Sequence, residues 1–315
     1  PLPAAEPTVR LAVDSSHRVV HIEAGPFAVA GAPQMDAMAH QHGGHHVGGE
    51  PTPFLPFRWP TDGWLRGVSL RITDAQGRAL PRALIHHVNV INLDRRQLLY
   101  PAAERTIALG QETEDIHLPA TVGIPIHSGT SMGLVVMWHN PDSVALEGVT
   151  VTLDVEWLPT NTAPRPLDVL TVYMDVRYPI GQPVEFDLPA GAQEFNAEFT
   201  MPIDGRIIAA GGHLHDYGTG LTLSEVGSGA PRNVISLATK RSPEGKVLAV
   251  DRKYPGIRGN GIRLDRGKRY RLTGSYDNST GSTIASGAMV HLLLLFAPKH
   301  PTDWPAVDPT EPEFR

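Results

Sequence analysis

Apolar and polar residues alternate along most of this chain, in short runs that recur at intervals of about ten residues. Residues 64–72 and 149–157 alternate most regularly, and residues 83–92 and 132–139 are more continuously apolar. In the second half, similar runs follow one another at 169–176, 184–188, 193–201, 206–215, 221–225, 233–237, 246–250, 270–276 and 288–296. A period of two is typical of strands, and no segment longer than about two turns has a helical period. The pattern predicts an all-β protein of two tandem, jelly-roll-like β-sandwich domains.

Two stretches interrupt this pattern. Residues 31–63 lack alternation and combine glycine, histidine and methionine with a proline-rich end, which predicts a long loop. Residues 158–166 contain three prolines and no apolar period, so we expect a linker at 159–166. The predicted organisation is an N-terminal domain at 1–158, a C-terminal domain at 167–300 and a proline-rich tail at 301–315.

Composition narrows the possible functions. The 315 residues include 31 glycines and 29 prolines, which suits a protein with many turns. The net charge of −6 provides no basic surface for nucleic acid. The absence of cysteine excludes thiolate metal sites and cysteine nucleophiles. No apolar run approaches the roughly 18 residues of a membrane span, so we expect no transmembrane segment.

The chain begins at Pro1 rather than at methionine. We therefore expect a removed signal peptide and a location outside the cytoplasm, whether secreted, periplasmic or at the cell surface.

The second half offers a candidate metal site. His213 and His215 are two residues apart, so on a strand both side chains point to the same face, where two imidazoles can hold one metal ion. Met289 and His291 have the same spacing, and a thioether beside imidazoles suits copper, especially Cu(I). The alternatives are a pair of surface histidines beside a turn and a methionine that packs in the core.

The first half offers His86, His87 and His139. Neighbouring residues of an ideal strand point to opposite faces, so His86 and His87 would need a bulge or a strand end to share an ion. Without one, we expect one buried and one exposed histidine. His139 ends an apolar strand, where a ligand would be well placed.

The loop at 31–63 is a further candidate for soft metals, or a segment that binds metal only adventitiously. Its candidate ligands are Met35, Met38, His40, His42, His45 and His46.

Several aspartates lie near these motifs. Asp204, Asp216 and Asp277 are candidates for acid–base roles, but turn aspartates more often accept backbone hydrogen bonds. Asp216 and Asn89 are also candidates to orient an imidazole. Residues 265–268 (Asp-Arg-Gly-Lys) are typical of a hairpin turn.

The order of the histidine and methionine motifs resembles the copper type II, ascorbate-dependent monooxygenases, which include the peptidylglycine and dopamine enzymes. The resemblance spans roughly residues 64–297 and rests on Ile85-His86-His87-Val88, Val135-Val136-Met137-Trp138-His139-Asn140-Pro141, Gly212-His213-Leu214-His215 and Gly287-Ala288-Met289-Val290-His291. It implies two β-sandwich domains with one copper ion in each. The first ion would be held by His86, His87 and His139, and the second by His213, His215 and Met289.

The resemblance implies that the Met-ligated copper activates O2 and that the all-histidine copper relays an electron from an external reductant such as ascorbate. His213, His215 and Met289 would then be the catalytic ligands. Three features depart from the family: the chain lacks its cysteines, Gly211 stands where the animal peptide enzyme has an arginine, and His291 and Leu293 follow Met289 in place of its polar contacts. The peptidylglycine substrate is therefore not carried over, and His291 either replaces Met289 as a ligand or joins it.

The leading hypothesis is a copper-dependent monooxygenase that hydroxylates a C–H bond of a small-molecule or peptide substrate with O2. The alternatives are a non-catalytic extracytoplasmic copper-binding protein, or a structural or surface subunit that retains a metal site.

Overall fold

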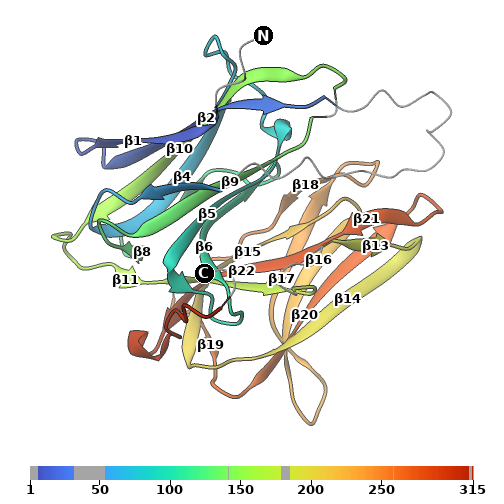
Figure 1. Ribbon diagram of the computed structural model, residues 1–315. Helices are drawn as coiled ribbons and strands as arrows, with labels where there is room; N and C mark the ends of the chain where they lie inside the picture. Colours follow the sequence, from blue (N-terminus) through green and yellow to red (C-terminus); the bar gives the residue numbers. More distant parts are fainter. Residues whose placement is uncertain are drawn as a thin grey trace. The chain divides into compact units, whose positions relative to one another are not determined.

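The computed structural model describes residues 6–31, 54–140, 142–178, 185–257, 259–311 and 314. These residues are almost entirely strands and turns, with two short 3-10 segments at Arg82–Leu84 and Pro301–Asp303 and no α-helix (Figure 1). The predicted all-β, β-sandwich fold is confirmed. No helix in this part of the chain has the length and apolar character needed to cross a lipid bilayer.

The strands form two compact units, each with its own sheets. Of the described residues, 6–31, 54–95 and 103–168 belong to the first unit, and 96–102 and those from 169 onward belong to the second. The division follows Asp168, so the proline-rich segment 159–166 is part of the first unit. There Thr162 donates its backbone N–H to Pro159 O at 3.0 Å, and Leu167 donates to Thr121 O at 2.8 Å.

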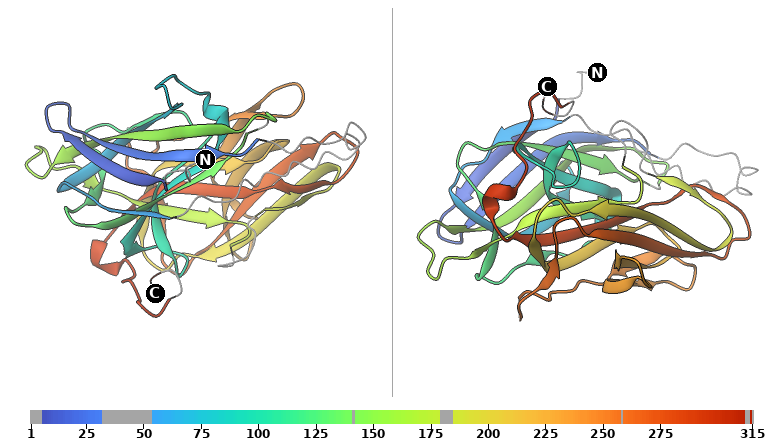
Figure 2. Two further views of the ribbon diagram at one scale, coloured as in Figure 1. Left: turned by 45° about the horizontal axis from the view of Figure 1, so that its top comes forward. Right: turned by 90° about the horizontal axis from the view of Figure 1, so that it is seen from below.

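Two sheets make up the first unit. The larger has the order β1-β2-β10-β4-β8-β11, with β7 paired to β4, and the smaller has the order β3-β9-β5-β6. Both views in Figure 2 show β1, β2 and β10 running side by side in the larger sheet. The bounds are β1 (Thr8–Asp14), β2 (Val19–Val29), β3 (Leu55–Arg58), β4 (Gly63–Thr73), β5 (Ile85–Arg96), β6 (Ala103–Gly110), β7 (Ile116–His117), β8 (Val122–Ile126), β9 (Ser131–Trp138), β10 (Leu146–Pro159) and β11 (Leu167–Asp168).

Alternation determines which side chains of the first unit are buried. Val151, Leu153 and Val155 of β10 are fully buried, whereas Asp154 and Glu156, which alternate with them, point to the opposite face and bind basic side chains. The regular pattern at 149–157 thus places one apolar row in the core and one polar row outside it.

The second unit contains a four-stranded, a five-stranded and a two-stranded sheet. Their orders are β12-β22-β15-β19, β14-β20-β16-β17-β18 and β13-β21. The bounds are β12 (Leu170–Asp175), β13 (Phe186–Leu188), β14 (Gly191–Thr200), β15 (Gly205–Leu214), β16 (Gly218–Val226), β17 (Arg232–Arg241), β18 (Val247–Val250), β19 (Ile262–Leu264), β20 (Arg269–Asn278), β21 (Ile284–Ala288) and β22 (Val290–Pro298).

One core joins the sheets of the second unit. Leu292 and Leu294 of β22 pack in the same buried cluster as Leu221 of β16 and Leu272 of β20. Leu292 and Leu294 are two residues apart on β22, so the residues that alternate with them point away from this core.

The predicted hairpin at 265–268 is a turn but not a hairpin. Lys268 N donates to Asp265 O at 3.2 Å, and Gly267 has a φ of +77°. The strands on either side enter different sheets, because β19 pairs with β15 and β20 pairs with β14 and β16.

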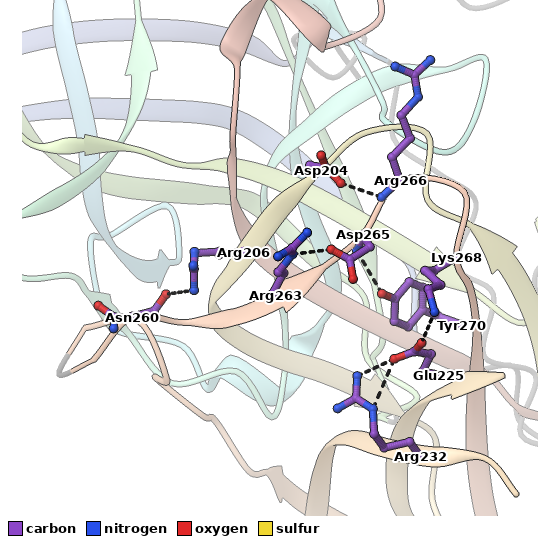
Figure 3. Close-up of polar contacts among 10 residues, drawn as sticks. All are labelled: Asp204, Arg206, Glu225, Arg232, Asn260, Arg263, Asp265, Arg266, Lys268 and Tyr270. Atoms are coloured by element: carbon purple, nitrogen blue, oxygen red, sulfur yellow. Dashed lines mark hydrogen bonds and ion pairs between the residues drawn. The ribbon is translucent and has the colours of Figure 1, made fainter. Parts of the chain in front are cut away.

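Acidic residues around this turn accept hydrogen bonds from neighbouring residues (Figure 3). The Arg266 N–H donates to Asp204 Oδ1 at 2.9 Å and thereby lowers the pKa of Asp204. Hydrogen bonds from Arg232 and Lys268 lower the pKa of Glu225 in the same way. These carboxylates are ionised partners of nearby donors rather than candidate acids.

Candidate metal centre

The antiparallel pairing of β15 with β22 brings the candidate ligands of the second unit together. His213 is the direct partner of His291, and Leu214 is the partner of Val290. The next residues along the two chains are His215 and Met289. Directly paired residues share a face, so His213 and His291 lie side by side, and His215 and Met289 come one residue beyond the last pair of the ladder.

His213 and His291 lie on the sheet face opposite the core. Leu214, Val290 and Leu292 belong to the buried core cluster, and they are the strand neighbours of these two histidines. Met289 is only 2% exposed but is not a member of that cluster, whereas its neighbours Ala288 and Val290 are. Met289 is one of the buried apolar residues of the structure, so its burial fits both readings of its sequence pattern, a core methionine and a ligand.

A β-bulge at Ile208 determines which face the histidines occupy. The register with β22 shifts between Ile207 and Ala209, so Ile207 and Ala210 both reach the core although they are three residues apart. The extra residue reverses the alternation, and His213 and His215 leave the core face. Gly256 N donates to Ile208 O at 2.9 Å, which secures the bulged residue.

The imidazole rings are close to one another. The ring centroids of His213 and His215 are 5.3 Å apart, and those of His213 and His291 are 5.9 Å apart. Imidazoles that share one ion through nitrogens about 2.0 Å from it have centroids roughly 5–6 Å apart. The Nε2 atoms of His213 and His215 are buried, which shields them from bulk water.

Asp175 is a member of this cluster that sequence reasoning missed. It is the last residue of β12, is paired directly with His291 and is 2% exposed. Its Oδ1 binds His291 Nδ1. A carboxylate at the end of an otherwise apolar buried strand is the local signal, but its partner lies 116 residues away in the sequence.

Tyr276 is the second residue that sequence reasoning missed. Its hydroxyl donates to Met289 O at 2.5 Å and accepts from Met289 N at 3.1 Å and from His215 N at 3.3 Å. Burial raises the pKa of Tyr276 far above its usual range, so the hydroxyl keeps the proton that it donates. One side chain thus fixes the main chain of two candidate ligands.

The carboxylate of Asp216, next to His215, accepts from Val247 N at 2.9 Å. Asp216 therefore stabilises the turn after β15. Carboxylates orient imidazoles in many metal sites, and here Asp175 occupies that place.

A second bulge shapes the histidine group of the first unit. The register of β5 with β9 shifts between Ile85 and His87, so the sequence requirement for a bulge at His86 is met. The rings of His86 and His87 lie together, with centroids 4.1 Å apart. His86 is buried and His87 is partly buried.

His139 lies next to this pair along the neighbouring strand. Its backbone N–H donates to Leu84 O at 2.8 Å, directly before β5. Met137 is the partner of His87, and alternation puts His139 on the same face as Met137. The candidates Met35, Met38, His40, His42, His45 and His46 lie outside the described residues.

Within the described ranges, no group of three or more His, Cys, Asp or Glu side chains is already arranged to hold a metal ion. A set of two histidines and one methionine is not a group of that kind. The imidazoles of His213, His215 and His291 would have to turn to bind one ion together. The donor types in the second unit, imidazole and thioether, suit copper.

The chain matches no protein-family model and no curated protein. Among solved structures, it is similar to one titled as the atomic structure of Sulfolobus Turreted Icosahedral Virus, with 11% identity, a TM-score of 0.37 and coverage of 93% of this chain and 90% of that chain. It is also similar to PNGF-II, with 12% identity, a TM-score of 0.39 and coverage of 90% of this chain and 66% of that chain. Both likenesses are remote, so the resemblance to copper monooxygenases remains a prediction from the sequence motifs.

Replacing Gly256 with alanine should disturb the bulge at Ile208. The added Cβ would lie 2.5 Å from Ile208 Cδ1 and 2.7 Å from Ile208 Cα, so the segments that contain Gly256 and Ile208 must move apart. We expect a loss of about 1–3 kcal/mol in the free energy of unfolding, as for overpacking elsewhere, and weaker copper binding by the second unit. Urea unfolding and copper competition measure the two effects. Gly229→Ala is the control, because nothing lies within 4 Å of its added Cβ; equal behaviour of the two variants would contradict the prediction.

Tyr276→Phe should weaken copper binding more than its effect on folding explains. The substitution removes the hydroxyl that forms hydrogen bonds with the backbone of Met289 and His215. Losing these bonds should lower the free energy of unfolding by about 1–3 kcal/mol. Tyr270→Phe is the matched control, since Tyr270 is equally buried and its hydroxyl accepts from Asp265 N, away from the histidines. Both variants should lose stability in urea, and only Tyr276→Phe should lower copper affinity. A similar affinity in both would show that Tyr276 has no specific role at the site.

Proposed function

We propose that this protein is a copper-dependent monooxygenase, with the copper that activates O2 bound at the ends of β15 and β22. The observation that carries the proposal is the pairing of His213 with His291 on the face opposite the core, with His215 and Met289 next to them in the chain at the ends of the same two strands. Three partly buried imidazoles near the ends of the two inner strands of a sheet are an unusual cluster unless they bind something.

The donor set favours copper over other common ions. Mg²⁺ and Ca²⁺ prefer oxygen ligands, and structural zinc sites usually include thiolates, which this chain lacks. Three histidines also suit catalytic zinc, so the thioether of Met289 is the donor that favours copper. Imidazole supports both Cu(I) and Cu(II), and a thioether favours Cu(I), the state that reacts with O2.

The histidines of the first unit support a second copper. The bulge at His86 gives two adjacent imidazoles a common side, and His139 follows on the neighbouring strand. A site with histidines alone suits an ion that cycles between two oxidation states. Two ions would deliver the two electrons that the reaction needs.

The proposed reaction inserts one oxygen atom of O2 into a substrate C–H bond and releases the other as water. It consumes two protons and two electrons, which an external reductant such as ascorbate supplies. Bound copper would supply the O2 activation. This chain's residues hold the ion, keep the imidazoles in place and shield their nitrogens.

The first test is the copper content of the full-length protein after copper loading and dialysis, measured by mass spectrometry. We expect two ions in the wild type and one in either His213→Ala or His86→Ala, because each variant removes a ligand of a different site. His17→Ala is the control, since that imidazole is 79% exposed and lies outside both groups. Ascorbate-driven O2 consumption should require copper and should be lost in His213→Ala.

The outcomes separate the proposal from its alternatives. Two firmly bound ions without O2 consumption would indicate a non-catalytic copper-binding protein. No retained copper in the wild type would overturn the proposal and favour a structural or surface subunit.

A further inference from the structure

We infer that His291 is a ligand of the copper site in the second unit and that Asp175 is the residue that positions it. The site would then be a three-imidazole centre made by His213, His215 and His291, with Met289 beside it. This inference rests on the proposed function, since it concerns the same ion, but it assigns a ligand and a positioning residue that differ from the two-histidine, one-methionine set that the motifs imply.

The three residues lie in one row across three strands. His213 of β15 is paired with His291 of β22, and His291 is paired with Asp175 of β12. All three therefore share the face opposite the core residues Met174, Leu292 and Leu214. His291 occupies the middle position and is 13% exposed at its side chain.

The hydrogen bond between Asp175 and His291 has the form found in metal sites. Ligating histidines usually donate the ring N–H that faces away from the metal to a carboxylate, which fixes the ring and makes the other nitrogen a stronger donor. With Nδ1 bound to Asp175 Oδ1, His291 would bind an ion through Nε2. Its ring centroid is 5.9 Å from that of His213, so the two rings are neighbours, and they would turn to direct their nitrogens at one ion.

Asp175 is itself held in place. Tyr100 Oη accepts from Asp175 N at 2.8 Å and donates to Asp175 O at 3.4 Å. Tyr100 belongs to the short segment 96–102 of the second unit, and its ring packs on Tyr178 with centroids 4.1 Å apart. A carboxylate that is 2% exposed and fixed through its main chain is suited to orient another side chain.

The chemical consequence concerns Cu(II). A third imidazole adds a borderline nitrogen donor where the motifs imply only a soft thioether, so the oxidised ion should be held more firmly. If His291 and Asp175 formed only a structural pair, their substitution would change stability but not the number of nitrogen ligands.

The test reads the second site alone. The parent is the full chain with His86→Ala and His87→Ala, which empties the first site, and with His40, His42, His45 and His46 each replaced by alanine, which removes the histidines of the predicted loop at 31–63. Bound Cu(II) is measured by competition with a chelator, and its nitrogen ligands are counted by electron paramagnetic resonance. We expect three imidazole nitrogens in the parent and two in His291→Gln, with an affinity at least 100-fold lower. Asp175→Asn should lower the affinity about 10–100-fold, the usual effect of losing such a partner.

The control is Asp154→Asn. It removes the carboxylate of another aspartate–histidine pair, in the first unit, where Asp154 Oδ1 lies 2.6 Å from His21 Nδ1. It should leave the affinity of the second site unchanged. The nitrogen count of the parent needs no further substitution, so it decides the question even if a variant folds poorly.

Each outcome has a distinct meaning. Two nitrogens in the parent, or His291→Gln with an affinity within about twofold of the parent, would overturn the three-imidazole centre, and loss of binding in Met289→Leu would then favour the thioether set. If the parent itself bound no copper, the proposed function would fail as well. If the parent bound copper and His213→Ala on the same background abolished that binding while His291→Gln did not, only this inference would fail.

Discussion

The reversal of side-chain alternation at Ile208 is the constraint on which the candidate site in the second unit depends. Before it, Ile207 enters the core; after it, Ala210 and Leu214 do. Without the extra residue, alternation from Ile207 would direct His213 and His215 into the apolar core, where unsatisfied polar rings cost several kcal/mol. The hydrogen bond from Gly256 and the lack of a side chain there allow the bulge to form. Core packing and ligand placement are therefore determined together.

The first unit uses the same device for a different pair. An extra residue at His86 in β5 lets two successive histidines lie ring to ring, which an ideal strand forbids. Bulges redirect one side chain at little cost to the rest of a sheet, which suits them to functional sites. In the first unit the histidines lie at the bulge itself, whereas in the second unit the bulge precedes His213 and His215 along β15 and sets the face that His213 occupies.

The acidic residues near the motifs have different roles that only their partners reveal. Asp204 and Asp216 accept backbone N–H groups and stabilise turns, whereas Asp175 binds an imidazole. Tyr276 likewise joins the segments of two candidate ligands, Met289 and His215, through one hydroxyl. The contacts of Asp175 and Tyr276 are partly or fully buried, so they limit the positions that the candidate ligands can adopt.

The sequence by itself determined the all-β class and the residues with metal-binding chemistry, because a period of two, turn residues and donor types are local properties. It also identified the need for a bulge at His86, since neighbouring strand residues face opposite ways. Only the tertiary structure decided which face His213 occupies, that it lies opposite His291, and that Asp175 and Tyr276 belong to the same cluster. Strand register and bulges arise from pairing between segments far apart in the chain, and their energies come from packing and hydrogen bonds that no local pattern records.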